Sequence, residues 1–207
     1  MITNTKLVTY IDAFDHSSID GKRQDLLKSM ARDLAQLYGQ HGVLKLMFVC
    51  THNSRRSHIS QLWAAAMAKK FELNNIETYS AGTEATAFNP RAVAAMKDAG
   101  FLIESDGVAD NPHYEIRINS EDAPIVAFSK TIKDASNPTE GFVAMMTCSE
   151  ADNDCPIVEG ALKRYSLHYR DPKEADGTPE ESQRYAERCQ QIGTEISYLF
   201  SRLVEHG

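Results

Sequence analysis

The sequence has no hydrophobic run long enough to cross a membrane. A membrane-spanning helix needs about 20 consecutive apolar residues, and no stretch of this chain approaches that length. The N-terminus also lacks the apolar core of a secretory signal peptide. We therefore expect a cytoplasmic protein without a membrane partner.

Positive charge is also scarce. The 207 residues include 22 Lys and Arg against 29 Asp and Glu, which gives a formal net charge of −7. A surface of that sign disfavours nucleic acid as a partner. The exception is local, because His52, Arg55, Arg56 and His58 lie close together in the sequence. Such a cluster favours a small anionic substrate.

Cysteine is sparse, with four residues: Cys50, Cys148, Cys155 and Cys189. In the cytoplasm thiols stay reduced, and any disulfide is expected to be transient or catalytic. Cys148 and Cys155 have no second cysteine pair and no histidine cluster nearby, so they match a zinc site poorly. We expect no bound metal. Cys189 falls on an apolar helical stripe, which predicts a core cysteine.

Strand and helix patterns alternate along most of the chain, which is typical of an α/β fold with a parallel sheet covered by helices on both faces. With 42% hydrophobic residues the chain can build a proper core. Strands are expected at residues 44–49, 76–80, 142–146 and 166–169, and helices at 56–70, 90–100 and 179–203. In the less regular section 105–140 we expect a β-hairpin insertion formed by residues 113–119 and 125–129.

Residues 1–43 precede the first expected strand and form an N-terminal helical extension, with the main domain at residues 44–207. One helical face of the extension is apolar and Gly42 is a plausible stop. We expect a helix that packs on the domain as additional cover, and a partner-binding helix is the alternative.

The most informative stretch is the segment that follows the first strand. An apolar run ends at Cys50, Arg56 follows six positions later, and a helical pattern begins there. In a strand–loop–helix unit, backbone N–H groups converge on an anion. A thiol in that field can have its pKa lowered from about 8.5 to about 3.5–7.5. Arg56 adds a fork of donors suited to an oxyanion, Ser54 and Ser57 add hydroxyls, and Asn53 tolerates left-handed backbone.

This pattern predicts a nucleophilic thiolate in an oxyanion cradle, and the alternative is a buried cysteine that ends a core strand. Asp171, after the last expected strand, suits a general acid, although an ordinary Asp-Pro turn also explains it. Cys148 and Cys155 bracket a polar segment that we expect to be a flexible loop. They suit a relay in which a second thiol resolves an adduct and a third carries the disulfide outward. Two incidental cysteines are the alternative.

Five segments in this order resemble the low-molecular-weight tyrosine phosphatase superfamily, and more closely its thioredoxin-coupled arsenate reductases: residues 49–57, 79–84, 89–93, 148–156 and 171–172. The resemblance implies a four-stranded parallel sheet flanked by helices. It also implies that Cys50 attacks arsenate with Asp171 as acid, and that Cys148 then forms a disulfide with Cys50. Cys155 would take over that disulfide, and thioredoxin would reduce it as the external reductant.

The resemblance also implies how the oxyanion is bound. Arg56 and the loop amides would hold it, and Ser57 would donate to the Cys50 thiolate. The loop residues that this assigns to substrate binding are Thr51, His52, Asn53, Ser54 and Arg55. Those reductases often bind potassium through an asparagine, a glutamate and a serine. Asn53 and Ser80 match this set, but Gln61 stands where the glutamate would be. We expect no bound cofactor.

Two other functions fit the same residues. A phosphatase for phosphotyrosine or a small phosphoester would use Cys50, Arg56 and Asp171 through a phosphocysteine. Lys173 and Glu174 stand where such phosphatases commonly carry aromatic residues that grip a tyrosine ring. The third possibility is a non-catalytic module that binds oxyanions or senses thiols, because a fold alone does not prove a function.

Overall fold

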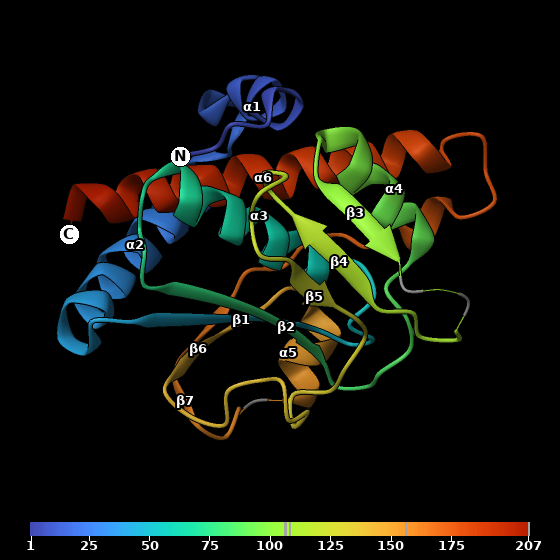
Figure 1. Cartoon of the computed structure of the whole chain (residues 1–207). Helices are drawn as coiled ribbons and strands as arrows, with labels where there is room; N and C mark the ends of the chain where they lie inside the picture. Colours follow the sequence, from blue (N-terminus) through green and yellow to red (C-terminus); the bar gives the residue numbers. More distant parts are fainter. Residues whose placement is uncertain (106, 108, 156, 207) are drawn as a thin grey trace.

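The centre of the molecule is a four-stranded parallel sheet with the order β2-β1-β6-β7 (Figure 1). Its strands are β1 (Leu44–Cys50), β2 (Ile76–Gly82), β6 (Phe142–Met146) and β7 (Ala161–Ser166). The computed structural model describes residues 1–105, 107, 109–155 and 157–206. Pro156, the last residue of the 148–156 segment, therefore lies outside the described residues.

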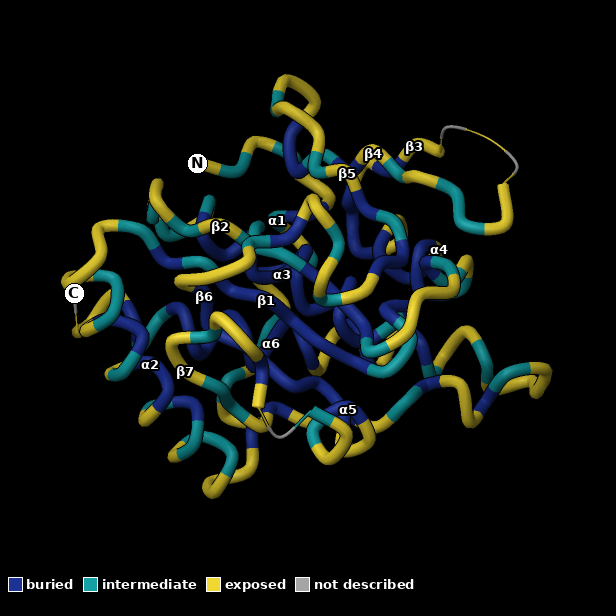
Figure 2. Tube along the Cα trace, turned by 90° about the horizontal axis from the view of Figure 1, so that it is seen from below, coloured by how far each residue is buried: buried dark blue, intermediate teal, exposed yellow. Residues whose placement is uncertain are grey.

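The register brings the chemically informative segments to one edge of the sheet. Cys50 is paired with Gly82 of β2, and Val49 is paired with Met146 of β6. Because the strands are parallel, Cys50 and the residues that follow Met146 lie at the same C-terminal edge, where ligands bind in such folds. β1 is buried along nearly its whole length, as its continuous apolar run predicts (Figure 2).

The position expected for the last strand was wrong. Residues 166–169 were expected as this strand, but β7 ends at Ser166. β7 is an edge strand with Lys163 and Arg164 in its middle, so its sequence lacks an apolar pattern. Leu167 and Tyr169 are buried because they pass beneath the helical layer after the strand has ended.

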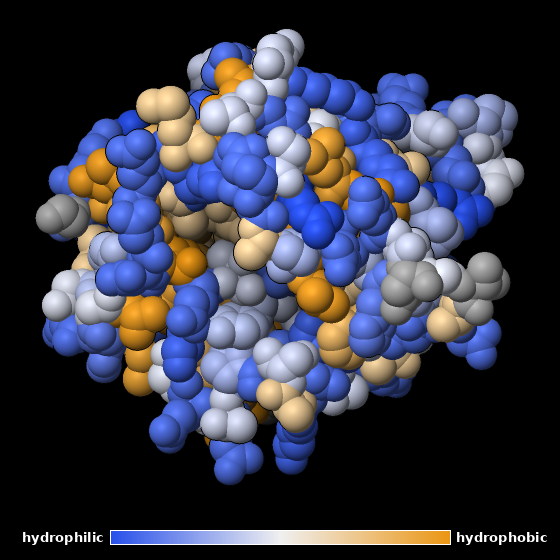
Figure 3. All heavy atoms as spheres, viewed as in Figure 1, coloured by the Kyte–Doolittle hydropathy of each residue, from blue (hydrophilic) through white to orange (hydrophobic). Residues whose placement is uncertain are grey.

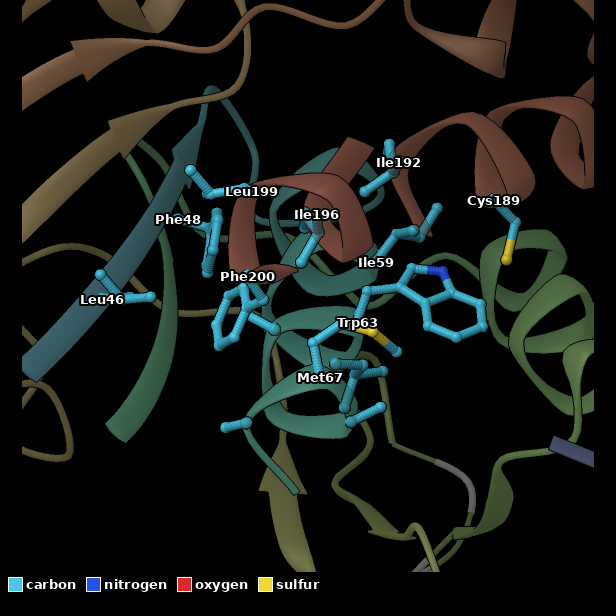
Figure 4. Packing of buried hydrophobic residues seen from close by; sticks show 14 of the residues in the cluster. Leu46, Phe48, Ile59, Trp63, Met67, Cys189, Ile192, Ile196, Leu199 and Phe200 are labelled. Carbon is cyan, nitrogen blue, oxygen red and sulfur yellow. The ribbon is translucent and has the colours of Figure 1, made fainter. Parts of the chain in front are cut away.

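One face of the sheet is covered by a thick helical layer. It contains α2 (Gly21–His41), α3 (Arg56–Lys70) and α6 (Glu181–His206), with α4 (Pro90–Ala99) packed against α6. Trp63 of α3 is fully buried in this core, where it lies beside Cys189 and Ile192 of α6 and farther from the β1 side chains (Figure 4). The short helix α5 (Ser149–Asp154) covers the other face, where Met47 and Val49 point. Helices therefore cover both faces, but unequally.

The expected hairpin is present as β4 (Tyr114–Arg117) and β5 (Ile125–Ala127). A third strand, β3 (Leu102–Ser105), pairs with β4 and completes a small antiparallel sheet. Ile103 and Ile116 of this sheet belong to the main core. The insertion is thus packed on the domain beside α4 (Figure 1).

The N-terminal extension contains α1 (Thr5–Asp12), a 3-10 turn at His16–Ser18, and α2. The apolar stripe correctly predicted α2, which ends before Gly42 at φ 68°. α1 was not expected, because eight residues are too few to show a clear helical period. Leu7, Leu27 and Leu34 are fully buried in the main core. The extension therefore packs as cover on the domain.

The face of the molecule that Figure 3 shows is mostly polar. In the view of Figure 3, hydrophobic residues appear as separate patches among hydrophilic ones. Among the described residues, no helix combines the length and the apolar character needed to cross a membrane.

Candidate functional site

The loop between β1 and α3 is shaped by two unusual backbone positions. Asn53 has φ 43°, in the left-handed region that asparagine tolerates better than most residues. Gly82 lies against the loop from β2: a Cβ at this position would be 2.6 Å from Asn53 N and 2.7 Å from Thr51 O. The loop therefore wraps tightly around the C-terminal end of β1.

A chain of hydrogen bonds leads from the backbone of Lys130, after β5, through Asn53 and Ser57 to Cys50. Lys130 N donates to Asn53 Oδ1 at 2.9 Å, and Asn53 Nδ2 donates to Ser57 Oγ at 2.9 Å. Ser57 Oγ lies 3.1 Å from Cys50 Sγ. Because Ser57 Oγ accepts a proton from the side-chain amide of Asn53, the Ser57 hydroxyl can donate its own proton to the Cys50 sulfur. This geometry suits a thiolate at Cys50.

Arg56 begins α3 and is only 7% exposed. Its Nη1 donates to Tyr169 O at 3.1 Å, and its Nη2 lies 2.9 Å from Asp171 Oδ2. Its Nε is buried and has no hydrogen-bond partner among the described residues. An unpaired donor of this kind costs free energy. An oxyanion beside the loop would supply the missing acceptor.

Asp171 is held between two arginines. Besides the contact with Arg56, its Oδ1 lies 3.9 Å from Arg55 Nε. The same Nε donates to Tyr185 Oη of α6 at 2.9 Å, and Tyr185 in turn donates to Asp176 Oδ1 at 2.8 Å. Arg55 was expected to bind substrate, but its side chain joins the loop to the Asp171–Asp176 segment and to α6. This structural role involves only the guanidinium group, and the Arg55 backbone remains part of the loop.

The other expected loop residues are placed as follows. Ser54 is buried and its carbonyl accepts a hydrogen bond from Asn89 N at the start of α4. His52 is partly exposed, with Nε2 3.6 Å from Glu84 Oε2. Thr51 Oγ1 lies 3.5 Å from Cys148 Sγ. The loop thus contacts α4, the end of β2 and the cysteine after β6.

Three of the four cysteines gather on one face of the sheet. Cys50 and Cys148 are buried in the same small cluster, and Cys155 packs against it. Burial raises the pKa of the Cys148 thiol, while the Thr51 hydroxyl and the Arg56 charge act in the opposite direction. Cys189 lies in the other core, where burial raises its pKa to about 12. Cys189 is thus a core cysteine as expected, among the apolar side chains of α3 and α6 (Figure 4).

The segment between Cys148 and Cys155 is not the flexible loop that was expected. It forms α5, with Cys148 Sγ accepting from Ala151 N at the N-terminus and Cys155 directly after the last helical residue. The six residues Ser-Glu-Ala-Asp-Asn-Asp place Glu150 and Asp152 in the first turn, where carboxylates favour a helix. Polar composition alone therefore gave the wrong secondary structure.

The residues that correspond to a potassium site do not fit a bound cation. Asn53 Oδ1 already accepts from Lys130 N, and Ser80 Oγ lies 3.1 Å from His58 Nδ1. Gln61 is neutral: its Nε2 donates to Thr78 O at 2.9 Å, and its buried Oε1 has no hydrogen-bond partner among the described residues. The buried Lys130 ammonium is close enough to lower the pKa of His58 by its charge. The positive charge of Lys130 would repel a potassium ion at this place, so we assign potassium no role.

His58 supports the loop from below as a neutral ring. It stacks on Phe88 with ring centroids 4.1 Å apart. Burial, together with the charge of Lys130, lowers the pKa of His58 from 6.5 to about 3. The unfolded chain therefore binds a proton at this residue between pH 6.5 and about 3 that the folded chain does not bind. Stability must fall as the pH falls through that window.

Replacing His58 with glutamine should remove this part of the pH dependence. For a group with these two pKa values, the loss between pH 7 and pH 5 is about 2 kcal/mol. We expect the free energy of unfolding, measured in urea, to fall between pH 7 and pH 5 by about 2 kcal/mol more in the wild type than in His58→Gln. Parallel losses in the two proteins would mean that His58 is not buried as a neutral ring.

A cavity of substantial size lies away from this loop. Its volume is about 690 Å³, and it lies between α6 and the start of α2, around the Arg23–Glu195 ion pair. None of the residues that line it belongs to the loop or to the cysteine cluster. We therefore identify the candidate active site from its reactive residues, Cys50, Arg56 and Asp171, and not from the position of this cavity.

Sequence reasoning missed several contributors to the site. Tyr185 lies one helical turn before Cys189 on the apolar stripe of the last helix, but its hydroxyl accepts a hydrogen bond from Arg55. A tyrosine in such a stripe carries a polar end that needs a partner, which is the signal that was available. Lys130 gave no such signal, because lysine is rarely buried, yet its side chain is buried here.

Comparison with known families gives a match over most of the chain. The model of the family described as "Low molecular weight phosphotyrosine protein phosphatase" matches residues 45–206. An arsenate reductase of Bacillus licheniformis is 30% identical over 162 residues, which are 78% of this chain and 96% of that protein. An arsenate reductase of Shouchella clausii is 31% identical over 152 residues, which are 73% of this chain and 91% of that protein.

Solved structures share the fold at lower identity. The crystal structure of a YwlE mutant from Bacillus subtilis has a TM-score of 0.52 at 16% identity, covering 78% of this chain and 99% of the other. A protein tyrosine phosphatase from Entamoeba histolytica, with Hepes in its active site, has a TM-score of 0.51 at 14% identity, covering 78% and 97% of the two chains. Both confirm the four-stranded parallel α/β architecture.

Proposed function

Since this chain belongs to the low molecular weight phosphotyrosine protein phosphatase family, a family of cysteine-dependent enzymes, we propose that it reduces arsenate to arsenite through Cys50, Cys148 and Cys155. One observation carries the proposal: the buried cluster that contains Cys50 also contains Cys148, and Cys155 packs against it. The relatives named arsenate reductase at about 30% identity support the same choice.

In the first step the Cys50 thiolate attacks arsenic and an oxygen leaves as water. The Ser57 hydroxyl stabilises the thiolate, and the free Nε of Arg56 and the loop amides bind the oxyanion. Asp171 contacts Arg56 and so lies beside the leaving oxygen, where it can supply a proton. An arriving anion competes with Asp171 for the guanidinium, which frees the carboxyl group to act as the acid.

In the second step the Cys148 thiolate attacks Cys50 sulfur. The sulfur–arsenic bond breaks, its electron pair reduces arsenic from the pentavalent to the trivalent state, and arsenite leaves. Burial raises the pKa of Cys148, so the resting group is a thiol and the Arg56 charge favours its deprotonation. Cys155 then attacks Cys148, releases Cys50 as a thiolate and forms the Cys148–Cys155 disulfide.

An external dithiol must reduce that final disulfide, and we propose thioredoxin for this role. A relay of this kind requires a compartment that keeps thiols reduced, so we also propose that the protein acts in the cytoplasm. The negative overall charge and the local positive charge at residues 52–58 are consistent with a small anionic substrate.

The test is arsenate-dependent NADPH oxidation coupled through thioredoxin and thioredoxin reductase. We expect steady turnover in the wild type and a single event per active site in Cys155→Ser, because the variant cannot pass on its Cys50–Cys148 disulfide. Hydrolysis of p-nitrophenyl phosphate by the same two proteins serves as the control for an intact cradle. Absence of arsenate turnover in the wild type would reject the reductase.

A phosphatase is the second candidate, and a specific observation favours it. The three groups that phosphoester hydrolysis needs, Cys50, Arg56 and Asp171, are assembled without any contribution from the distal cysteines. Steady hydrolysis of p-nitrophenyl phosphate that is unaffected by Cys155→Ser, without arsenate turnover, would favour the phosphatase. The substrate would then be phosphotyrosine or a small phosphoester.

A further inference from the structure

The helix α5 keeps Cys148 and Cys155 apart. Cys148 precedes its first residue and Cys155 follows its last. Two backbone hydrogen bonds close the helix at these cysteines: Asp152 N donates to Cys148 O at 3.1 Å, and Cys155 N donates to Ala151 O at 3.0 Å. Seven residues at a helical rise of about 1.5 Å per residue separate the two Cα atoms by about 10 Å. A disulfide requires about 7 Å or less, so α5 must unwind before one can form.

A group of side chains from β7 and the segment after it holds α5 in its wound state. Arg164 of β7 reaches under the helix: its Nε donates to Cys155 O at 3.1 Å, and its Nη2 bonds to Asp152 O. The same Nη2 forms an ion pair with the Asp152 carboxylate. Arg164 thereby holds two backbone carbonyls of α5 that unwinding would displace.

Asp152 is the point at which these contacts converge. Its Oδ2 accepts from Ser166 Oγ at 2.6 Å and lies 2.7 Å from His168 Nε2. Its side chain is 13% exposed. Burial acts to raise the pKa of Asp152, but the hydrogen bonds from Ser166 and His168 and the charge of Arg164 lower it below its usual value. Asp152 is therefore a carboxylate at neutral pH, and its bonds are of the strong charge-assisted kind.

We propose that Asp152, Arg164, Ser166 and His168 form a latch that keeps α5 wound and thereby controls when Cys155 can reach Cys148. The inference rests on the proposed relay and goes beyond it, because it assigns a positioning role to residues that touch neither substrate nor sulfur. The latch acts on the dithiol state alone, since forming the disulfide displaces the carbonyl groups that Arg164 holds. Removing the latch should make the pair easier to oxidise.

The test is a redox titration of the full chain without arsenate. A Cys50→Ser background is incubated in mixtures of glutathione and glutathione disulfide, quenched in acid and mapped by mass spectrometry. In this equilibrium the two protein thiols give up two electrons and two protons, and one glutathione disulfide becomes two molecules of glutathione. The measured quantity is the equilibrium constant for the Cys148–Cys155 disulfide.

Arg164→Met should shift that equilibrium toward the disulfide by about tenfold, which lowers the reduction potential of the pair by about 30 mV. The methionine keeps much of the aliphatic stem and removes the donors. Asp152→Asn, which keeps the shape of the side chain, should give a shift in the same direction if Arg164→Met folds poorly. Arg164→Lys retains the charge without the fork and should lie between wild type and Arg164→Met.

Arg202→Met is the matched control, because Arg202 lies on α6 and pairs with Glu205 there. It should leave the equilibrium unchanged. An unchanged constant in both Arg164→Met and Asp152→Asn, a shift toward the dithiol, or failure of the pair to form in any protein would overturn the latch. A failed arsenate assay with the expected shift would reject the reductase and leave the latch standing.

Discussion

Serine in place of Cys50 should reduce turnover of both arsenate and aryl phosphate by more than about 10⁴-fold. The hydroxyl of serine is a far weaker nucleophile than a thiolate, and the side chain that lies within hydrogen-bond distance of this position is a serine, Ser57, which is a poor general base. The Asn53–Ser57 hydrogen bond and the Arg56 side chain do not depend on the sulfur. Binding of inorganic phosphate, measured by calorimetry, should therefore persist when turnover is lost.

Cys189→Ser provides the matched control for this prediction. The same atom is replaced, but Cys189 is fully buried on α6, in the core that does not contain the loop. A hydroxyl without a good partner there should lower the stability by about 1–3 kcal/mol and leave turnover by the folded protein unchanged. If Cys50→Ser retained more than a few per cent of either activity, the nucleophile would have to be another residue.

Alanine in place of Gly82 should impair both the loop and the fold. The added Cβ would lie 2.3 Å from Glu84 O, and it would also meet Asn53 N and Thr51 O. All three contacts are with backbone atoms, so no side chain can turn away to relieve them. The loop must shift by a large part of an ångström, and misplacement on that scale costs about 10²-fold in rate. Overpacking of this kind also costs about 1–3 kcal/mol of stability.

The measurement is turnover of p-nitrophenyl phosphate together with urea unfolding. Gly39→Ala is the control, because Gly39 is exposed within α2 and a Cβ there meets nothing within 4 Å. Because alanine favours a helix more than glycine does, Gly39→Ala should stabilise the protein by about 0.5–1 kcal/mol and leave its activity intact. If Gly82→Ala behaved like Gly39→Ala, the loop would not be held against β2 in solution.

The sequence predicted best those elements whose burial is nearly complete. β1 and β6 are hydrophobic on both faces, so their apolar runs mark them almost to the residue. The Cys50–Arg56 loop could be predicted because everything that forms it, except its supports, lies within seven consecutive residues. Such local features can be recognised in the sequence without knowledge of the fold.

Elements that depend on distant partners could not be predicted in the same way. β7 carries charged residues at the sheet edge, and Lys163 and Arg164 are explained by their contacts with Asp33 and α5. The role of Arg55 depends on Tyr185, which is 130 residues away in the sequence. α5 is short and polar, so its helical state reflects Arg164 and the sheet beneath it more than its own composition.

The packing of α2 against α6 also has a consequence for the order in which the chain folds. Leu27, Met30 and Leu34 of α2 are fully buried in the core that α6 completes. Residues 21–41 leave the ribosome well before residues 181–206, and at about 5–20 residues per second the delay is about 8–30 s. During that interval the apolar face of α2 lacks α6, the helix that completes its packing. The helix that is synthesised early therefore depends on the last one, and the nascent chain is exposed to aggregation until its final helix arrives.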